Sequence, residues 1–310
     1  MTNKKLIIIF AALLGVYLLS RLFTGNREST FDPEVVKVDT ALITEVHLYP
    51  KAEENTQIIL RRTTDGWTAT KGDQTVKTPF NKVQGLLGQL SEITSQRIVS
   101  KSKEKWAEYE VDDKGSRVQV FNNKKQLADF IVGTFKFDQA RRSASSYLRR
   151  MDEDAVYLVD GFMSMSFNQG FNTFRNNELI KLNQEDIREV AVLEGSQKIA
   201  ISKNPEDGLW YRGGMEKLDS TKSAQYISQL TNIYGSDYVD TPIIGNPIKS
   251  LEISGNNLLT PLRVDCYAQP DTAKPFVLHA SSNPEAWFSS DSAGIYQRIF
   301  KKFDELLYVQ

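Results

Sequence analysis

The hydrophobic pattern is densest near the start of the chain, where an unbroken apolar run occupies residues 6–19. Extended to Phe23, it gives about 18 residues, or about 27 Å of helix, just enough to cross the hydrocarbon core of a bilayer. Lys4 and Lys5 precede the run and favour a cytoplasmic N-terminus. We therefore predict an α-helical transmembrane anchor over residues 1–23. Its lipid-contacting side chains are expected to be Leu6, Ile9, Leu13, Val16, Leu19 and Phe23.

Two other interpretations fit this run less well. A cleaved signal peptide would have a hydrophobic region of this length, but its cleavage site requires small residues. A cut after Ser20 would put Leu18 in the outer recognition position, and a cut after Gly25 would put Phe23 there. No cysteine follows the run to carry a lipoprotein anchor. A buried core helix fits least well, so we favour an uncleaved anchor, followed by a polar tether over residues 24–37.

The remainder of the chain contains an internal repeat. The segment DTALITEVHLYP that starts at Asp39 resembles NQEDIREVAVLEG, which starts at Asn183. A second apolar strand, a Gly close to a Trp, an amphipathic helix and a short extended segment follow in each copy. The offset is 144 residues at the first strand (Ile43 to Ile187) and 140 at the helix (Leu87 to Ile227). We predict a first repeat over residues 38–160 and a second over residues 182–310.

The C-terminal halves of the two repeats match less well. Val156–Tyr157 and Ile295–Tyr296 are taken as equivalent, each preceded by a strand that carries aromatic residues. Between the repeats, residues 161–181 are predicted to form a linker with a short or kinked helix. Its apolar side chains, which we expect to pack between domains, are Phe162, Met165, Phe171 and Phe174.

The periodicities favour an α+β fold. Alternating pairs such as Val46 and Leu48 are typical of half-buried antiparallel strands. One apolar stripe at helical spacing comprises Val83, Leu86, Leu87, Leu90 and Ile93, and its counterpart comprises Tyr226, Ile227, Leu230 and Ile233. Thr78 and Asp219 are the expected caps of the two helices. The predicted fold is thus a transmembrane helix followed by two tandem repeats, each a mostly antiparallel sheet with one packed helix.

The amino-acid composition limits the classes of function that this chain can have. The chain has 310 residues, 38 Lys and Arg against 39 Asp and Glu, one cysteine (Cys266) and two histidines. The balanced charge argues against nucleic-acid binding, and a single cysteine excludes an intrachain disulfide. His47 and His279 lie in strand-like segments without a neighbouring ligand motif, so we expect no metal, no cofactor and no enzymatic activity. Asp152, Glu153 and Asp154 are typical of a hairpin turn.

A local basic stretch is hidden in this balance. Lys136 and four arginines fall within fifteen residues, interleaved with aromatic side chains. The structural interpretation is a long hairpin with a solvated tip, and the functional one is contact with a protein partner or an anionic surface. The second repeat carries no basic residue over Asn283–Ser292, which we take as its counterpart. The candidate contact residues are Arg141, Arg142, Tyr147, Arg149 and Arg150.

The anchor, the strand ITEVHLY with QIILRR and GW, and the helix LLGQLSEI with RIV resemble a bacterial membrane-anchored family, domain of unknown function 4340. The strands SSYLRR and AVYLVD and the segment FRNNELIKL add to the resemblance. It implies an extracytoplasmic domain held at the bacterial inner membrane, encoded beside ABC-type transporters, with no known catalytic residues.

We therefore expect a non-enzymatic, single-pass membrane protein with a cytoplasmic N-terminus and a periplasmic bulk. It would bind the bilayer through its N-terminal helix and a protein partner within an envelope complex, such as an ABC-type transporter. Two alternatives stay open: an extracytoplasmic ligand-binding protein that uses a cleft between the repeats, and an envelope hydrolase.

Overall fold

The computed structural model describes residues 14, 33–140 and 142–308. The predicted anchor residues Leu6, Ile9, Leu13, Val16, Leu19 and Phe23 lie outside these described residues, as does Arg141. Among the residues that are described, no helix has the length and apolar character needed to span a membrane.

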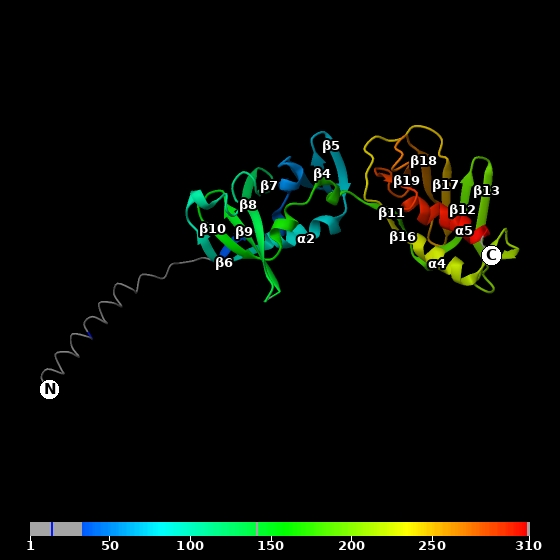
Figure 1. Cartoon of the computed structure of the whole chain (residues 1–310), viewed down its shortest axis with the longest axis horizontal. Coiled ribbons are helices and arrows are strands. Elements are labelled where there is room, and N and C mark those ends of the chain that lie inside the picture. Colours follow the sequence, from blue (N-terminus) through cyan, green and yellow to red (C-terminus); the bar gives the residue numbers. More distant parts are fainter. Residues whose placement is uncertain (1–13, 15–32, 141, 309–310) are drawn as a thin grey trace, which may run out of the picture. The chain divides into compact units, whose positions relative to one another are not determined.

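Most described strands belong to two large antiparallel sheets (Figure 1). Those of the ten-stranded sheet are β1 (Glu34–Lys37), β2 (Glu45–Tyr49), β3 (Ile58–Thr63), β4 (Gly66–Lys71), β5 (Gln74–Thr78), β6 (Glu92–Ser100), β7 (Ser116–Asn122), β8 (Lys125–Asp138), β9 (Ser143–Arg150) and β10 (Val156–Asp160). Those of the eight-stranded sheet are β12 (Ile187–Glu194), β13 (Gln197–Lys203), β14 (Trp210–Arg212), β15 (Glu216–Lys217), β17 (Lys249–Gly255), β18 (Leu262–Ala268), β19 (Phe276–Ala280) and β20 (Trp287–Ser290). A small sheet pairs β11 (Glu178–Lys181) with β16 (Asn232–Tyr234).

The described helices are fewer than the strands, and they are short. The α-helices are α2 (Phe80–Ser91), α3 (Met163–Ser166), α4 (Ser220–Leu230) and α5 (Lys302–Tyr308), the last preceded by a π-helical turn over Gln297–Lys301. Short 3-10 turns occupy Thr40–Leu42, Lys51–Glu53, Lys103–Lys105, Phe171–Phe174 and Gln184–Asp186. Mostly antiparallel sheets with few helices were predicted from the periodicities, and this coarse prediction is confirmed.

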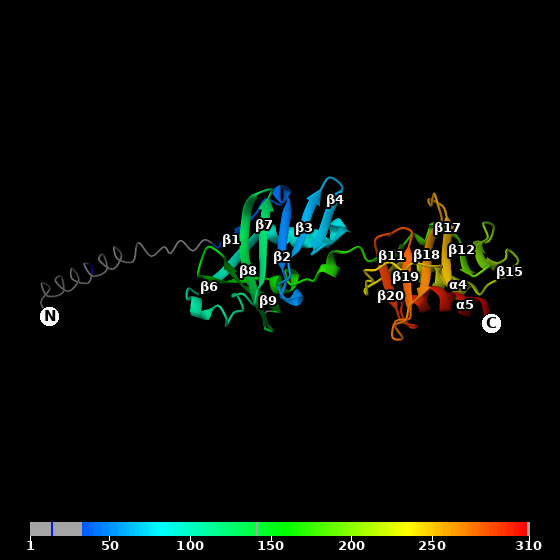
Figure 2. The ribbon, with the colours of Figure 1, turned by 90° about the horizontal axis from the view of Figure 1, so that it is seen from above.

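The two sheets share one strand order. Taken from β5, the first runs β5-β4-β3-β2-β7-β8-β9-β10-β6-β1, and the second runs β15-β14-β13-β12-β17-β18-β19-β20. Figure 2 shows β8, β7, β2, β3 and β4 side by side in that sequence. The β1–β6 pair aligns Val36 with Ile93, and the β11–β16 pair aligns Ile180 with Ile233 after the same register shift. This is the topology expected when one unit is duplicated.

This strand order corrects our alignment of the C-terminal halves. Val156 and Tyr157 lie on β10, whose counterpart β20 begins at Trp287, whereas Ile295 and Tyr296 follow that strand. Likewise, the β8–β9 hairpin corresponds to the β18–β19 hairpin with its turn at residues 269–275, not to Asn283–Ser292. The error arose because β8 has 14 residues and β18 only 7, so that counting along the chain shifts the alignment by one strand.

Contacts divide the described chain into two compact units. The first comprises residues 33–62 and 83–170, and the second comprises residues 63–82 and 171–308. Val35 and Val36 are buried on β1, so the last four residues of the predicted tether belong to the described fold. Similarly, β11 takes the last four residues of the predicted linker.

The apolar helical stripes are buried as expected. Val83, Leu86, Leu87 and Leu90 are buried on α2, which lies along the first sheet, while Ile93 is buried on β6 (Figure 1). On α4, the buried apolar residues are Tyr226, Ile227 and Leu230.

Of the two predicted helix caps, one is confirmed and one is wrong. The Asp219 carboxylate accepts a hydrogen bond from the Lys222 N–H at 2.8 Å and so caps α4, as predicted. The Thr78 prediction was wrong: this residue ends β5, and its buried Oγ1 has no hydrogen-bond partner among the described residues. Of the four apolar linker residues that were expected to pack, Phe171 and Phe174 are buried, whereas Phe162 and Met165 are exposed.

Candidate interaction surface

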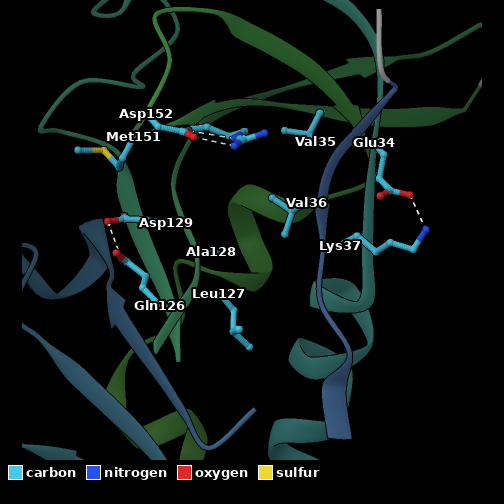
Figure 3. A pocket seen from close by; sticks show the side chains of 11 residues that line it. Glu34, Val35, Val36, Lys37, Gln126, Leu127, Ala128, Asp129, Met151 and Asp152 are labelled. Carbon is cyan, nitrogen blue, oxygen red and sulfur yellow. Dashed lines mark hydrogen bonds and ion pairs between the residues drawn. The ribbon is translucent and has the colours of Figure 1, made fainter. Parts of the chain in front are cut away.

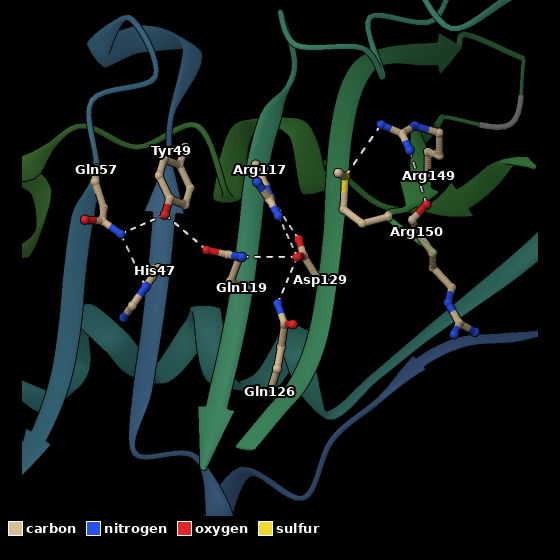
Figure 4. A network of polar contacts seen from close by, with 10 residues as sticks. His47, Tyr49, Gln57, Arg117, Gln119, Gln126, Asp129, Arg149 and Arg150 are labelled. Carbon is tan, nitrogen blue, oxygen red and sulfur yellow. Dashed lines mark hydrogen bonds and ion pairs between the residues drawn. The ribbon is translucent and has the colours of Figure 1, made fainter. Parts of the chain in front are cut away.

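A network of polar side chains covers one face of the first sheet (Figure 4). Residues of a strand point alternately to opposite faces, so the buried Val118 and Val120 leave Arg117 and Gln119 on the other side. The pairing of β7 with β8 then places Asp129 opposite Gln119. Local alternation and sheet register together therefore assemble a polar cluster from two strands.

Asp129 is the hub of this network. Arg117 donates two hydrogen bonds to the carboxylate, from Nε at 2.9 Å and from Nη2 at 2.7 Å. The amide groups of Gln119 and Gln126 donate to the same carboxylate at 3.1 Å and 2.8 Å. A bidentate guanidinium pair is the strongest common ion-pair geometry, and the four donors fix the carboxylate in place.

The network continues toward β2. Tyr49 donates its hydroxyl to Gln119 Oε1 at 3.0 Å and accepts from Gln57 Nε2 at 2.7 Å. Gln57 Nε2 also lies 3.3 Å from His47 Nδ1, and His47 Nε2 lies 3.0 Å from a Glu45 oxygen. The result is a continuous row of polar contacts from His47 to Asp129 across the sheet face.

Two carboxylates of this face have lowered pKa values. Burial raises the pKa of Asp129, but the hydrogen bonds from Arg117 and Gln119 outweigh it, and the pKa falls below its ordinary value. At Glu45, hydrogen bonds from His47 and Arg61 likewise outweigh burial and lower the pKa. Both carboxylates are therefore ionised at neutral pH.

A hollow of about 630 Å³ adjoins the network (Figure 3). It is bounded by β1, by the start of β8, and by the turn after β9. Its lining residues are Glu34, Val35, Val36, Lys37, Gln126, Leu127, Ala128, Asp129, Arg150, Met151 and Asp152. Each carboxylate of the lining has a partner: Glu34 pairs with Lys37 at 2.6 Å, Asp152 with Arg150 at 2.7 Å, and Asp129 with Arg117. The hollow thus combines a few apolar side chains with paired charges.

The predicted contact residues that the structure describes occupy different environments. Arg142 is exposed at the tip of the β8–β9 hairpin, while Arg150 lines the hollow and pairs with Asp152. Tyr147 is half-buried, with its ring centroid 4.6 Å from that of Tyr109. The structure therefore brings Arg150 to the hollow and leaves Arg142 far along the same hairpin.

Arg149 is held inside the fold. Its side chain is 4% exposed, Nε donates to the Val111 carbonyl at 2.9 Å, and the guanidinium carbon lies 3.8 Å from the Trp106 ring centroid. Burial lowers its pKa below the ordinary arginine value. These contacts tie the segment before β7 to β9, and they leave little of the Arg149 charge at the surface.

A scan against protein-family models matches residues 71–246 to the domain of unknown function DUF4340, which is more than half of the chain. The chain belongs to the DUF4340 family. No curated protein and no solved structure matches it. The DUF4340 match includes Arg117, Asp129 and the whole β8–β9 hairpin, and it ends before β17. The description of this family names no activity.

The second unit of this DUF4340 protein has a matching hub of opposite charge. Register places Glu252 opposite Arg263, as Gln119 lies opposite Asp129. Arg263 Nε donates to Asp265 at 2.8 Å and Nη2 donates to Ser250 Oγ at 3.1 Å. A guanidinium thus occupies the position that a carboxylate holds in the first sheet.

The two histidines lie in separate environments. His47 belongs to the polar network, whereas the His279 ring stacks on Trp287 at a centroid distance of 4.2 Å. Within the described ranges, no group of three His, Cys, Asp or Glu side chains is arranged to hold a metal ion.

Sequence reasoning missed the Asp129 hub and the hollow. The alternation of Arg117 and Gln119 with two valines was the available signal, but the pairing of β7 with β8 cannot be inferred from it.

Proposed function

We propose that this chain is a non-enzymatic, single-pass protein of the bacterial inner membrane, anchored by residues 1–23. Its duplicated extracytoplasmic part would serve as an accessory, partner-binding module of an envelope complex. The apolar run of the sequence supports the anchor, and the shared strand order supports the duplication. An ABC-type transporter as the setting rests on the family resemblance alone.

The observation that carries the binding role is the polar network with its adjoining hollow in the first unit. Preorganised side chains bind a partner without the entropic cost of being ordered at the moment of binding. The network fixes Arg117, Gln119 and Asp129 through mutual hydrogen bonds. Beside them, the hollow is lined by Val36 and Leu127 and by paired charges, so the surface combines fixed polar groups with a recess of mixed character.

The proposal is tested by co-purification of the full-length chain from native membranes in mild detergent after crosslinking. Leu127→Arg places a long cation in the hollow, and Leu259→Arg is the matched control at an exposed turn of the second unit. We expect a defined partner to co-purify with the wild type and with Leu259→Arg, and its yield to fall at least about tenfold for Leu127→Arg.

Because Leu127 is half-buried, the exposed Gln126→Arg, which also lines the hollow, provides a second variant with less risk to folding. Unchanged thermal unfolding midpoints would show that either variant is folded. Isolation of the wild type as a lone monomer, or full partner recovery with both folded hollow variants, would overturn the proposed role.

A further inference from the structure

Four large apolar side chains are exposed together at one end of the first unit. Phe135 and Phe137 lie near the end of β8, Phe162 immediately precedes α3 and Met165 lies on α3, with exposed fractions of 44%, 48%, 44% and 59%. The Phe162 ring centroid lies 5.8 Å from that of Phe135 and 6.3 Å from that of Phe137. These rings form one contiguous patch, which a folded protein leaves exposed mainly where it contacts something else.

Two of the rings, Phe135 and Phe137, lie on an extended hairpin. The β8–β9 pairing continues to Asp138 opposite Ser143, and Figure 1 shows these strands projecting beyond the body of the first unit. The equivalent β18–β19 turn over residues 269–275 includes none of the exposed large apolar side chains of the described chain. Among the described residues, the exposed apolar side chains at this hairpin are therefore particular to the first unit. We call this region the aromatic finger, and it consists of Phe135, Lys136, Phe137, Arg142, Phe162 and Met165.

The finger also carries positive charge near its tip. Lys136 lies between Phe135 and Phe137 on β8, so its side chain points to the opposite face of the hairpin from the two rings, and residues 134–142 contain three basic residues against one acid, Asp138. Aromatic rings flanked by Lys and Arg suit the membrane interface, where the rings enter the headgroup region and the cations meet lipid phosphates. A neutral protein groove would satisfy the rings but not this excess of cations.

The position of the finger in the chain favours the bilayer as its occupant. The apolar run ends at Phe23 and the described fold begins with β1 at Glu34. The ten intervening residues span at most about 35 Å when fully extended. The first unit, which carries the finger, is thus also the unit that would be held close to the membrane.

We infer that the aromatic finger inserts into the interface of an anionic lipid bilayer and gives the first unit a second point of membrane contact. This inference rests on the proposed anchor. The two contacts would restrict the orientation of the first unit at the membrane surface, because one covalent tether alone leaves a domain free to rotate.

The test uses the full-length chain reconstituted into vesicles of phosphatidylglycerol and phosphatidylcholine with brominated acyl chains, which quench nearby tryptophan. Phe137→Trp reports on the finger, and Leu259→Trp is the matched control at an exposed turn of the second unit. After subtraction of wild-type emission, we expect at least about twofold quenching of Trp emission for Phe137→Trp and none for Leu259→Trp. The combined Lys136→Gln and Arg142→Gln change should reduce this quenching, most strongly in the anionic vesicles.

Vesicle flotation distinguishes failure of the proposed anchor from failure of the finger inference. A chain that floats with the vesicles but shows no quenching at position 137 retains its anchor and overturns the finger inference. A chain that fails to float overturns the proposed anchor, and with it the inference that depends on it. Equal quenching of both tryptophan variants would also overturn the finger inference, because contact would then not be specific to the finger.

Discussion

Asp129 and Arg149 are two charged residues of the first sheet whose charges are stabilised by different kinds of contact. Asp129 remains half-buried on the sheet face and receives hydrogen bonds from Arg117 and two glutamine amides. Arg149 is buried without a carboxylate in direct contact among the described residues, and a carbonyl and the Trp106 ring stabilise its charge instead. The first arrangement presents an ordered polar surface, whereas the second holds two segments of the fold together.

The Asp129 network predicts a pH dependence of stability. Because the pKa of the folded Asp129 lies below its ordinary value of 3.8, the folded state binds this proton less readily than the unfolded state. Its stabilising contribution is therefore present above pH 3.8 and is lost as the pH falls through the folded pKa. We expect Asp129→Asn to lower the free energy of unfolding by about 1 kcal/mol at about pH 6 and by less at about pH 3.

Urea unfolding of both proteins at the two pH values measures this difference. The exposed Asp113→Asn is the control for loss of one carboxylate. An equal destabilisation by Asp129→Asn at both pH values would show that the carboxylate charge is not what stabilises the network.

At the scale of elements, the two packed helices and the strands before them were predictable, because their apolar periodicity survives in the sequence. The stripe containing Leu87 and its counterpart containing Ile227 defined α2 and α4, although Ile93 lies on the strand that follows. The β8–β9 hairpin was predicted only in outline. Its length, and the separation of exposed Arg142 from buried Arg149, depend on sheet register, which one sequence does not reveal.

Two glycines provide a test of these elements. Gly88 is exposed on α2, and a Cβ added there would meet nothing within 4 Å, so Gly88→Ala should raise the free energy of unfolding by about 0.5–1 kcal/mol.

A Cβ at Gly133 on β8 would lie 1.9 Å from the Tyr109 carbonyl oxygen, so Gly133→Ala should lower the free energy of unfolding by several times the gain expected for Gly88→Ala. Chemical denaturation measures both changes, and a neutral Gly133→Ala would contradict the close approach of these two segments.

At the scale of the whole molecule, the chain combines a repeated architecture with unequal surfaces. The two sheets share their strand order, yet the hub is Asp129 in one and Arg263 in the other. The exposed aromatic finger belongs to the first unit only. The apolar pattern of the sequence shows similar segments at an offset of 144 to 140 residues, whereas the hubs depend on pairing between strands, which the sequence does not reveal.

The central claim is that this repeated part lies outside the cytoplasm while attached to the membrane. The native Cys266 is buried, and burial raises the pKa of its thiol to about 12, so it reacts poorly. A cysteine introduced by Leu259→Cys, at a fully exposed position, would therefore be a clean reporter.

The decisive measurement is labelling of this variant in intact spheroplasts with a membrane-impermeant maleimide, compared with labelling after lysis. An extracytoplasmic module predicts equal labelling before and after lysis, with wild-type protein unlabelled in both. Labelling that appears only after lysis would place the module in the cytoplasm and contradict the account.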